Sequence, residues 1–230
     1  NNSEVWVNGE HVGYRPNGYV SFIYDVTEKL RPGKGNVIAV KVDHTKDADS
    51  RWYTGSGIYR DVYLISSAQT HIDNWGVFAR TLEVREDGSA LIGVSVNVVN
   101  DGEKPASVKI VNRLRRKEAL IAESVAPVGL PAGRSWKAEN TLLVKYPELW
   151  SVDSPALYEL ETIILDAKGN KIDGTKVKVG IRTTRFDADK GFFLNGKNMK
   201  LKGVCLHHDA GSLGAVIPED VWRRRLKTLK

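Results

Sequence analysis

The residues best suited to chemistry lie in one short segment, 203–211, which reads GVCLHHDAG. In an extended backbone successive side chains point to opposite faces, so His207 and Asp209 are expected on one side and His208 on the other. One imidazole and one carboxylate therefore converge. A catalytic zinc ion usually takes three protein ligands, which this pair alone does not supply. The alternative is a polar turn that only caps a strand or is solvated.

The flanking sequence predicts the elements that would position this segment. Residues 199–202 form a strand-like run before it. After it, residues 218–220 supply the rigid, acidic first turn of a helix, in which Trp222, Leu226 and Leu229 recur on one apolar stripe. Strand, polar loop and helix make one β/α unit, and such units place functional side chains at the C-terminal end of the strand.

Composition indicates a globular protein. Of 230 residues, 41% are hydrophobic and 27% are charged, and the length suits one large or two ordinary domains. The formal charge is +6, but Lys and Arg are scattered except in 113–117 and 223–227, and the second cluster fits the solvated face of a helix. We therefore expect no nucleic-acid partner.

Cysteine usage and hydropathy restrict the functional classes further. Cys205 is the single cysteine, so no intrachain disulfide can form. No apolar run approaches the ~20 residues of a membrane span, and no membrane partner is expected. Asn1 begins directly in strand-like sequence, which favours a chain cut from something longer.

The first region, residues 1–67, reads as short strands. An Asn-Gly pair at 8–9 predicts a tight hairpin. Further strands are expected at 19–24, 36–42 and 62–66 from the spacing of apolar residues. This spacing is typical of a β-sandwich.

The second region, residues 68–183, starts a new series of strands. Alternation is cleanest at 90–98 and returns at 106–111, 158–164 and 177–181. About seven short strands separated by turns favour an immunoglobulin-like sandwich. A second Asn-Gly hairpin, at 195–196, then leads into the candidate β/α unit.

Three separated segments together resemble glycoside hydrolase family 2, the family of β-galactosidases, β-glucuronidases and β-mannosidases. They read VNGEHVGYRPNGYVSFIYDVT with RWYTGSGIYRDV near the start, ELWSVDSPALYELE with VGIRTTRF in the middle, and FFLNGKNMKLKGVCLHHD at the end. The resemblance spans the whole chain. It implies a mainly β fold: the C-terminal part of a jelly-roll sugar-binding domain at 1–67, an immunoglobulin-like sandwich at 68–183, and the truncated start of a (β/α)8 TIM barrel at 184–230.

The resemblance also implies roles for single residues. His207 matches a histidine that contacts the sugar in the active site, and Asp209 resembles the acidic member of a common His-Glu-Asp run, with His208 where glutamate is usual. Asp49 matches a carboxylate that the jelly-roll domain lends to the pocket, where it binds sugar hydroxyls and helps to ligate sodium, although Asp47 is a near neighbour. A parent enzyme would use sodium or magnesium by resemblance, and no cofactor is certain for this chain.

The reaction of the family needs two carboxyl groups that this chain does not supply. Retaining glycosidases place an acid/base and a nucleophile about 5.5 Å apart. By resemblance both come from later barrel strands, and after Lys202 the sequence offers only Asp209, Glu219 and Asp220. We expect no catalytic residue in this chain, and no turnover by it.

The resulting interpretation is a fragment of a retaining glycosidase of carbohydrate catabolism. The parent would act on terminal β-glycosides, as a β-galactosidase or alternatively a β-glucuronidase or β-mannosidase, with a β-linked saccharide as partner. A periplasmic or secreted parent is favoured by resemblance, and no targeting residues are present. The terminal regions at 1–67 and 184–230 belong to incomplete domains in this interpretation, and they are expected to be disordered or to self-associate.

Two alternatives from other classes stay open. One is a carbohydrate-binding or adhesion module, in which Trp52 and Tyr53 stack on sugar faces. The other is a structural spacer between domains. The last 30 residues discriminate, because a binding module has no use for a barrel-type β/α unit.

Overall fold

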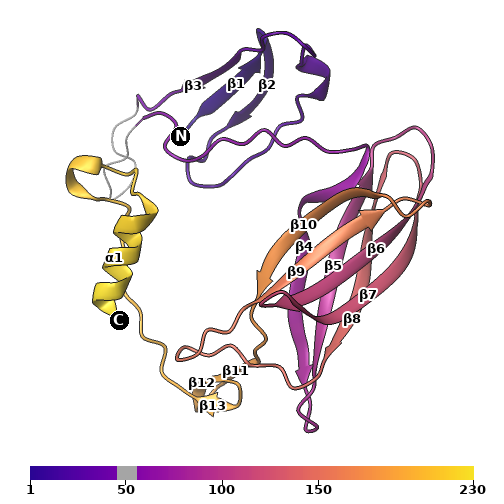
Figure 1. Ribbon diagram of the computed structural model, residues 1–230. Helices are drawn as coiled ribbons and strands as arrows, with labels where there is room; N and C mark the ends of the chain where they lie inside the picture. The colour runs from indigo at the N-terminus through magenta and orange to yellow at the C-terminus, as the bar shows by residue number, and fades with distance from the viewer. Residues whose placement is uncertain (46–55) are drawn as a thin grey trace. The chain divides into compact units, whose positions relative to one another are not determined.

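The computed structural model describes residues 1–45 and 56–230 (Figure 1). The described chain divides into two compact units, Asn1–Leu64 with Val204–Lys230, and Ile65–Gly203.

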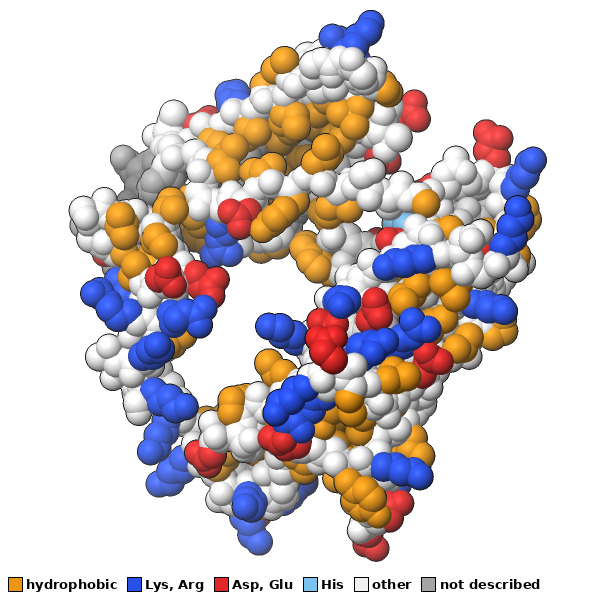
Figure 2. Space-filling model, viewed as in Figure 1, with side chains coloured by type: hydrophobic (Ala, Val, Ile, Leu, Met, Phe, Trp, Pro, Cys, Tyr) orange, Lys and Arg blue, Asp and Glu red, His pale blue; other side chains and the backbone are white. Residues whose placement is uncertain are grey.

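The first unit contains a three-stranded antiparallel sheet with the order β2-β1-β3. Its elements are β1 (Ser3–Val7), β2 (Glu10–Arg15), a 3-10 turn η1 (Thr27–Lys29) and β3 (Ile38–Val42). Val5 and Val7 of β1 are buried, whereas Ile38 and Val40 of β3 are exposed. Figure 2 shows hydrophobic side chains gathered over this sheet.

The turn between β1 and β2 confirms the hairpin predicted from Asn-Gly. Asn8 and Gly9 have φ angles of 53° and 89°, the left-handed values that a tight primed turn requires. The Asn8 side chain also ties this turn to the approach of β3, because its Nδ2 donates to Lys29 O at 2.7 Å and its Oδ1 accepts from Val37 N at 3.1 Å. A single asparagine therefore shapes the turn and fixes its neighbour.

The strands expected at 19–24 and 62–66 do not form. In the first segment, Asn17 Oδ1 accepts hydrogen bonds from the backbone N–H groups of Tyr19 and Val20, at 2.8 and 3.1 Å, and this local turn competes with an extended ladder. In the second, Val62 and Leu64 are exposed, and no described strand pairs with them. Apolar spacing alone was insufficient where no partner strand was available.

The main part of the second unit is a seven-stranded sandwich. One sheet has the order β4-β5-β8 and the other β10-β9-β6-β7, with antiparallel neighbours in both. This arrangement confirms the immunoglobulin-like sandwich. The bounds are β4 Thr70–Val84, β5 Ala90–Asn100, β6 Ala106–Arg116, β7 Ala119–Leu130, β8 Arg134–Val144, β9 Tyr158–Leu165 and β10 Lys171–Val179.

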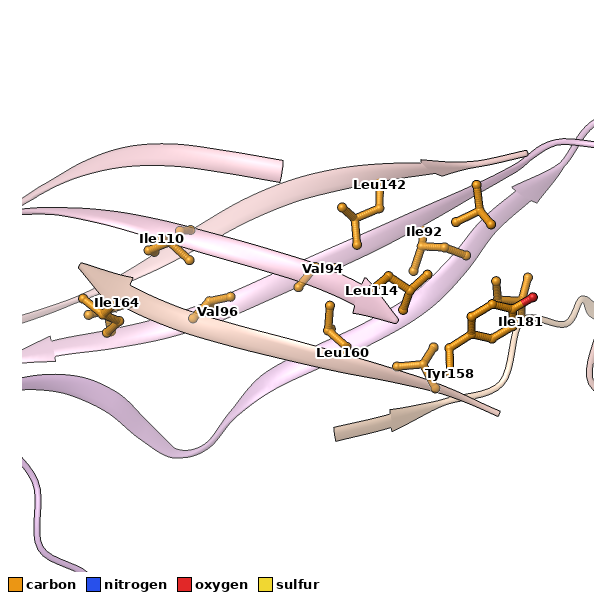
Figure 3. Close-up of a cluster of buried hydrophobic side chains, with 14 of the residues drawn as sticks. Ile92, Val94, Val96, Ile110, Leu114, Leu142, Tyr158, Leu160, Ile164 and Ile181 are labelled. Carbon is orange, nitrogen blue, oxygen red and sulfur yellow. The ribbon is translucent and has the colours of Figure 1, made fainter. Parts of the chain in front are cut away.

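The core of the sandwich lies between its two sheets (Figure 3). Alternate residues of β5 are fully or almost fully buried, as strict alternation predicts. They meet inward-facing residues of β6 and β9, of which Leu114, Leu160 and Ile164 are completely buried. Burial of one such side chain contributes about 1.5–3 kcal/mol relative to leaving it in water. This core holds the second unit together.

The four-stranded sheet of the sandwich ends in β7 on one side and β10 on the other. Pro127 lies within β7, in register with Lys109 of β6. Proline is tolerated in a strand at an edge, where its missing N–H need not serve a ladder on both sides. Glu123 Oε2, in the same edge strand, lies 2.6 Å from Nε of Arg113 in the neighbouring strand β6.

A small hairpin sheet follows the sandwich, in the order β11-β12-β13, and its strands are Thr184–Asp187, Gly191–Leu194 and Lys197–Asn198. Asn195, in the predicted Asn-Gly turn, donates from Nδ2 to Trp150 O at 3.0 Å and accepts at Oδ1 from Thr183 N at 3.0 Å. The Arg182 guanidinium lies 4.5 Å from the centre of the Trp150 ring. These contacts fasten the hairpin to the sandwich.

Candidate functional site

The strand expected at 199–202, directly before the segment 203–211, does not form, so that prediction was wrong. No described strand pairs with these residues, so the backbone has no ladder that would impose strict alternation. His207 and Asp209 are exposed, and His208 is half-buried. The three side chains therefore owe their positions to contacts of the loop, not to the pleat of a sheet.

The C-terminal side of this loop is anchored to the predicted helix. This helix, α1, spans Glu219–Leu229 and confirms the expected element. Arg225 Nη2 donates to Asp209 O at 2.7 Å, which ties the loop backbone to α1. Asp209 Oδ1 accepts from Gly211 N at 3.0 Å, and Ala210 N donates to Gly214 O at 3.1 Å around a 3-10 turn, η2 (Gly211–Leu213). The Asp209 carboxylate thus stabilises the local turn while its side chain remains exposed to solvent.

His208 contacts an aromatic residue of the first region. Its ring lies edge-to-face against Tyr19, with ring centroids 5.7 Å apart and an interplanar angle of 75°. The backbone beneath Tyr19 is itself held, because Tyr59 Oη donates to Gly18 O at 3.2 Å and Gly18 N donates to Asn1 Oδ1 at 3.1 Å. Tyr19 was not predicted as a site residue from the sequence. The signal that could have found it is the Asn17-Gly18 pair directly before it, which favours a turn and so places Tyr19 on a loop.

The remaining carboxylates after Lys202 lie at the start of α1. Glu219 and Asp220 occupy its first turn. Arg223 of the same helix pairs with both, since its Nη2 lies 2.5 Å from Glu219 Oε1 and its Nε lies 3.9 Å from Asp220 Oδ1. Both side chains are largely exposed to solvent. Both carboxylates pair with the same arginine and lie in solvent, so neither sits in the water-excluded pocket in which a glycosidic oxygen would be protonated. That this chain lacks the acid/base and the nucleophile stays a prediction.

Asp49, the third predicted binding residue, lies outside the described residues, as do Asp47, Trp52 and Tyr53. Within residues 1–45 and 56–230, no group of three or more His, Cys, Asp or Glu side chains could hold a metal ion.

The basic cluster at 113–117 meets acidic partners in the sandwich. Arg113 pairs with Glu123, and Arg116 pairs with Glu148. The hydrogen bonds from Arg116 and then from the Ser154 hydroxyl hold the pKa of the Glu148 carboxyl below its usual value. Figure 2 shows cationic and anionic side chains intermixed on the visible face. Such pairing gives this cluster a structural role.

None of the helices that the structure describes is both long and apolar enough to cross a membrane.

Two family models match the chain. Residues 1–68 match the model described as glycosyl hydrolases family 2, sugar binding domain, and residues 70–182 match the one described as glycosyl hydrolases family 2. The two matches together cover most of the sequence.

Individual relatives are similar over nearly the whole chain. A β-galactosidase of Bacteroides ovatus is 40% identical over 100% of this chain, and a β-glucuronidase of Bacteroides fragilis is 30% identical over 92%. A solved glycosyl hydrolase family 2 member from Bacteroides cellulosilyticus superposes with a TM-score of 0.92 at 36% identity, over 98% of this chain. The chain spans 27%, 32% and 31% of the respective lengths of these three proteins.

Proposed function

The chain belongs to glycosyl hydrolase family 2, and on that premise we propose that it is part of a longer enzyme that hydrolyses terminal β-glycosides with retention of configuration. The observation that carries the proposal is the match of two successive family models along the chain. A β-galactoside is the first candidate substrate, because the relative from Bacteroides ovatus, 40% identical over the full chain, is named as a β-galactosidase.

In this proposal the chain supplies the accessory half of the enzyme. Residues 1–67 belong to the sugar-binding domain, and residues 184–230 begin a (β/α)8 barrel. His207, Asp209 and Asp49 bind sugar hydroxyls, while the acid/base and the nucleophile come from elsewhere in the longer protein. Two features support these roles: His207 and Asp209 are exposed, and the loop between them and α1 is anchored by Arg225.

A second substrate class has a specific observation in its favour. The relative from Bacteroides fragilis is named as a β-glucuronidase, so a β-glucuronide is the competing substrate. A purely sugar-binding or adhesive protein is disfavoured by α1, whose exposed Leu226 and Leu229 need a covering element such as a barrel. We also propose a periplasmic or secreted location, where polymeric saccharides would be met.

The test of this function uses the longer protein that contains the chain. Nitrophenyl β-galactoside and nitrophenyl β-glucuronide are offered at equal concentration, and proton NMR follows the anomer that is first released. We expect faster hydrolysis of the galactoside and first release of the β-anomer, as a double displacement requires. First release of the α-anomer would overturn the retaining mechanism, and hydrolysis of neither compound would overturn the proposed activity.

Replacing His207 tests the binding role of the loop. In the longer enzyme, His207→Ala is expected to lower kcat/KM for the preferred aryl glycoside by about 10²-fold or more, because the imidazole would bind the transition state better than the ground state. His11→Ala, at another exposed histidine of the same unit, is the matched control and should retain activity. An unchanged rate in folded His207→Ala protein would reduce His207 to a capping residue.

A further inference from the structure

We propose that Tyr19 is a positioning residue for residues 203–211, here called the histidine loop, and that it acts through His208. The proposal rests on the function proposed above, in which His207 and Asp209 bind sugar. The observation is the edge-to-face contact between the Tyr19 and His208 rings, 5.7 Å between centroids. It joins two stretches of the first unit that are far apart in sequence.

Both sides of this contact are fixed by other bonds. Tyr19 stands on a loop held by Asn17 Oδ1, which accepts from Tyr19 N at 2.8 Å, and by Tyr59 Oη, which donates to Gly18 O. A Cβ atom at Gly18 would lie 2.8 Å from the backbone N of Asn1, so the loop is closely packed there as well. The ring of Tyr19 therefore projects from a defined backbone and can act as a fixed surface.

The other partner in the contact, the histidine loop, is held at its C-terminal end by α1. The hydrogen bond from Arg225 to Asp209 O holds the loop from its C-terminal side. The ring contact of His208 with Tyr19 adds a second support one residue earlier. The two contacts, at 208 and at 209, restrain the backbone next to His207 from its C-terminal side. Small displacements of a binding group reduce its use in the transition state, so this restraint bears directly on His207.

The chemistry of the contact distinguishes positioning from simple space filling. An edge-to-face pair depends on the charge distribution of an aromatic ring, which phenylalanine keeps and leucine does not. The Tyr19 hydroxyl is not needed for it. Tyr19 keeps 47% of its surface exposed, so loss of the ring should leave little cavity and little general destabilisation.

The experiment uses the longer protein and compares Tyr19→Leu with Tyr19→Phe. Hydrogen exchange is followed by mass spectrometry in peptides that cover 204–214, and kcat and KM are measured separately. Tyr63→Leu is the matched control, since Tyr63 is an exposed tyrosine of the same unit whose Oη donates locally, to Asp61 Oδ2. His208→Leu and the double variant Tyr19→Leu/His208→Leu complete a double-mutant cycle, which measures the coupling between the two side chains.

We expect Tyr19→Leu to speed exchange in 204–214 and to lower kcat/KM by about two- to tenfold, which one lost aromatic pair allows. Tyr19→Phe and Tyr63→Leu should behave as wild type, and the double variant should be no worse than His208→Leu alone. Wild-type exchange in Tyr19→Leu, or fully additive losses in the cycle, would overturn the proposal. If the wild-type enzyme hydrolyses no glycoside, the proposed function fails, while the exchange measurements still decide whether Tyr19 positions the loop.

Discussion

The isolated 230-residue chain is expected to produce no nitrophenol from nitrophenyl β-galactoside above the uncatalysed rate. Retention needs two carboxyl groups about 5.5 Å apart across the glycosidic bond. After Lys202 the sequence has three carboxylates, of which Glu219 and Asp220 are paired with Arg223 at the start of a solvated helix. Without an acid and a nucleophile, water must meet nearly the whole uncatalysed barrier.

The measurement is a long incubation at high protein concentration, with the longer enzyme as the positive control. Activity that follows the chain through a second chromatographic column, and that disappears in Asp209→Asn, would contradict the expectation. It would mean that the chain contains a catalytic carboxylate whose role has been misjudged.

The second large effect is expected in the sandwich core. Leu114→Ala should lower the free energy of unfolding of the sandwich by about 2–5 kcal/mol, because a completely buried side chain is replaced by a cavity. Leu143→Ala, on the half-exposed outer face of β8, is the control and should change it by less than about 1 kcal/mol. Urea unfolding followed by circular dichroism gives both values, and equal losses in the two variants would contradict this account of the core.

Hydrogen exchange on the same chain tests where its stability lies. Amide protection should be highest at 92–98 and 158–164, in the central strands β5 and β9, and lowest after Cys205. If 204–230 proved as protected as these strands in a strictly monomeric sample, the interpretation of that region as the start of a barrel would be wrong. Concentration-dependent protection there would instead support self-association.

How far the sequence predicts this fold depends on how local each signal is. Alternation predicts β5 because one face of that strand meets the core along its whole length. Three strands of the sandwich, β4, β7 and β8, were not predicted from the sequence, because their alternation of apolar and polar residues is weaker. In β4 the register shifts between Ile72 and Val77, where Trp75 has a φ of 52°, and β7 contains Pro127. A bulge and a proline interrupt the pattern without ending the strand.

The candidate site was predictable only in part. The histidine loop and its helix could be located from spacing, but the roles of His207 and Asp209 came from the resemblance to a family. Tyr19 could not be found, because its contact with His208 joins residues that periodicity does not relate. Asp49 stays a prediction, since it lies outside the described residues.

The proline in β7 has a further consequence for how the protein behaves in a crowded solution. A sheet edge presents unpaired N–H and C=O groups that can recruit a strand from another molecule. Pro127 removes one N–H from β7, and Glu123, four residues earlier in the same strand, adds a charge that pairs with Arg113 of β6. These features oppose edge-to-edge aggregation at that side of the sandwich, and a Pro127→Val substitution would remove this protection while leaving the core untouched.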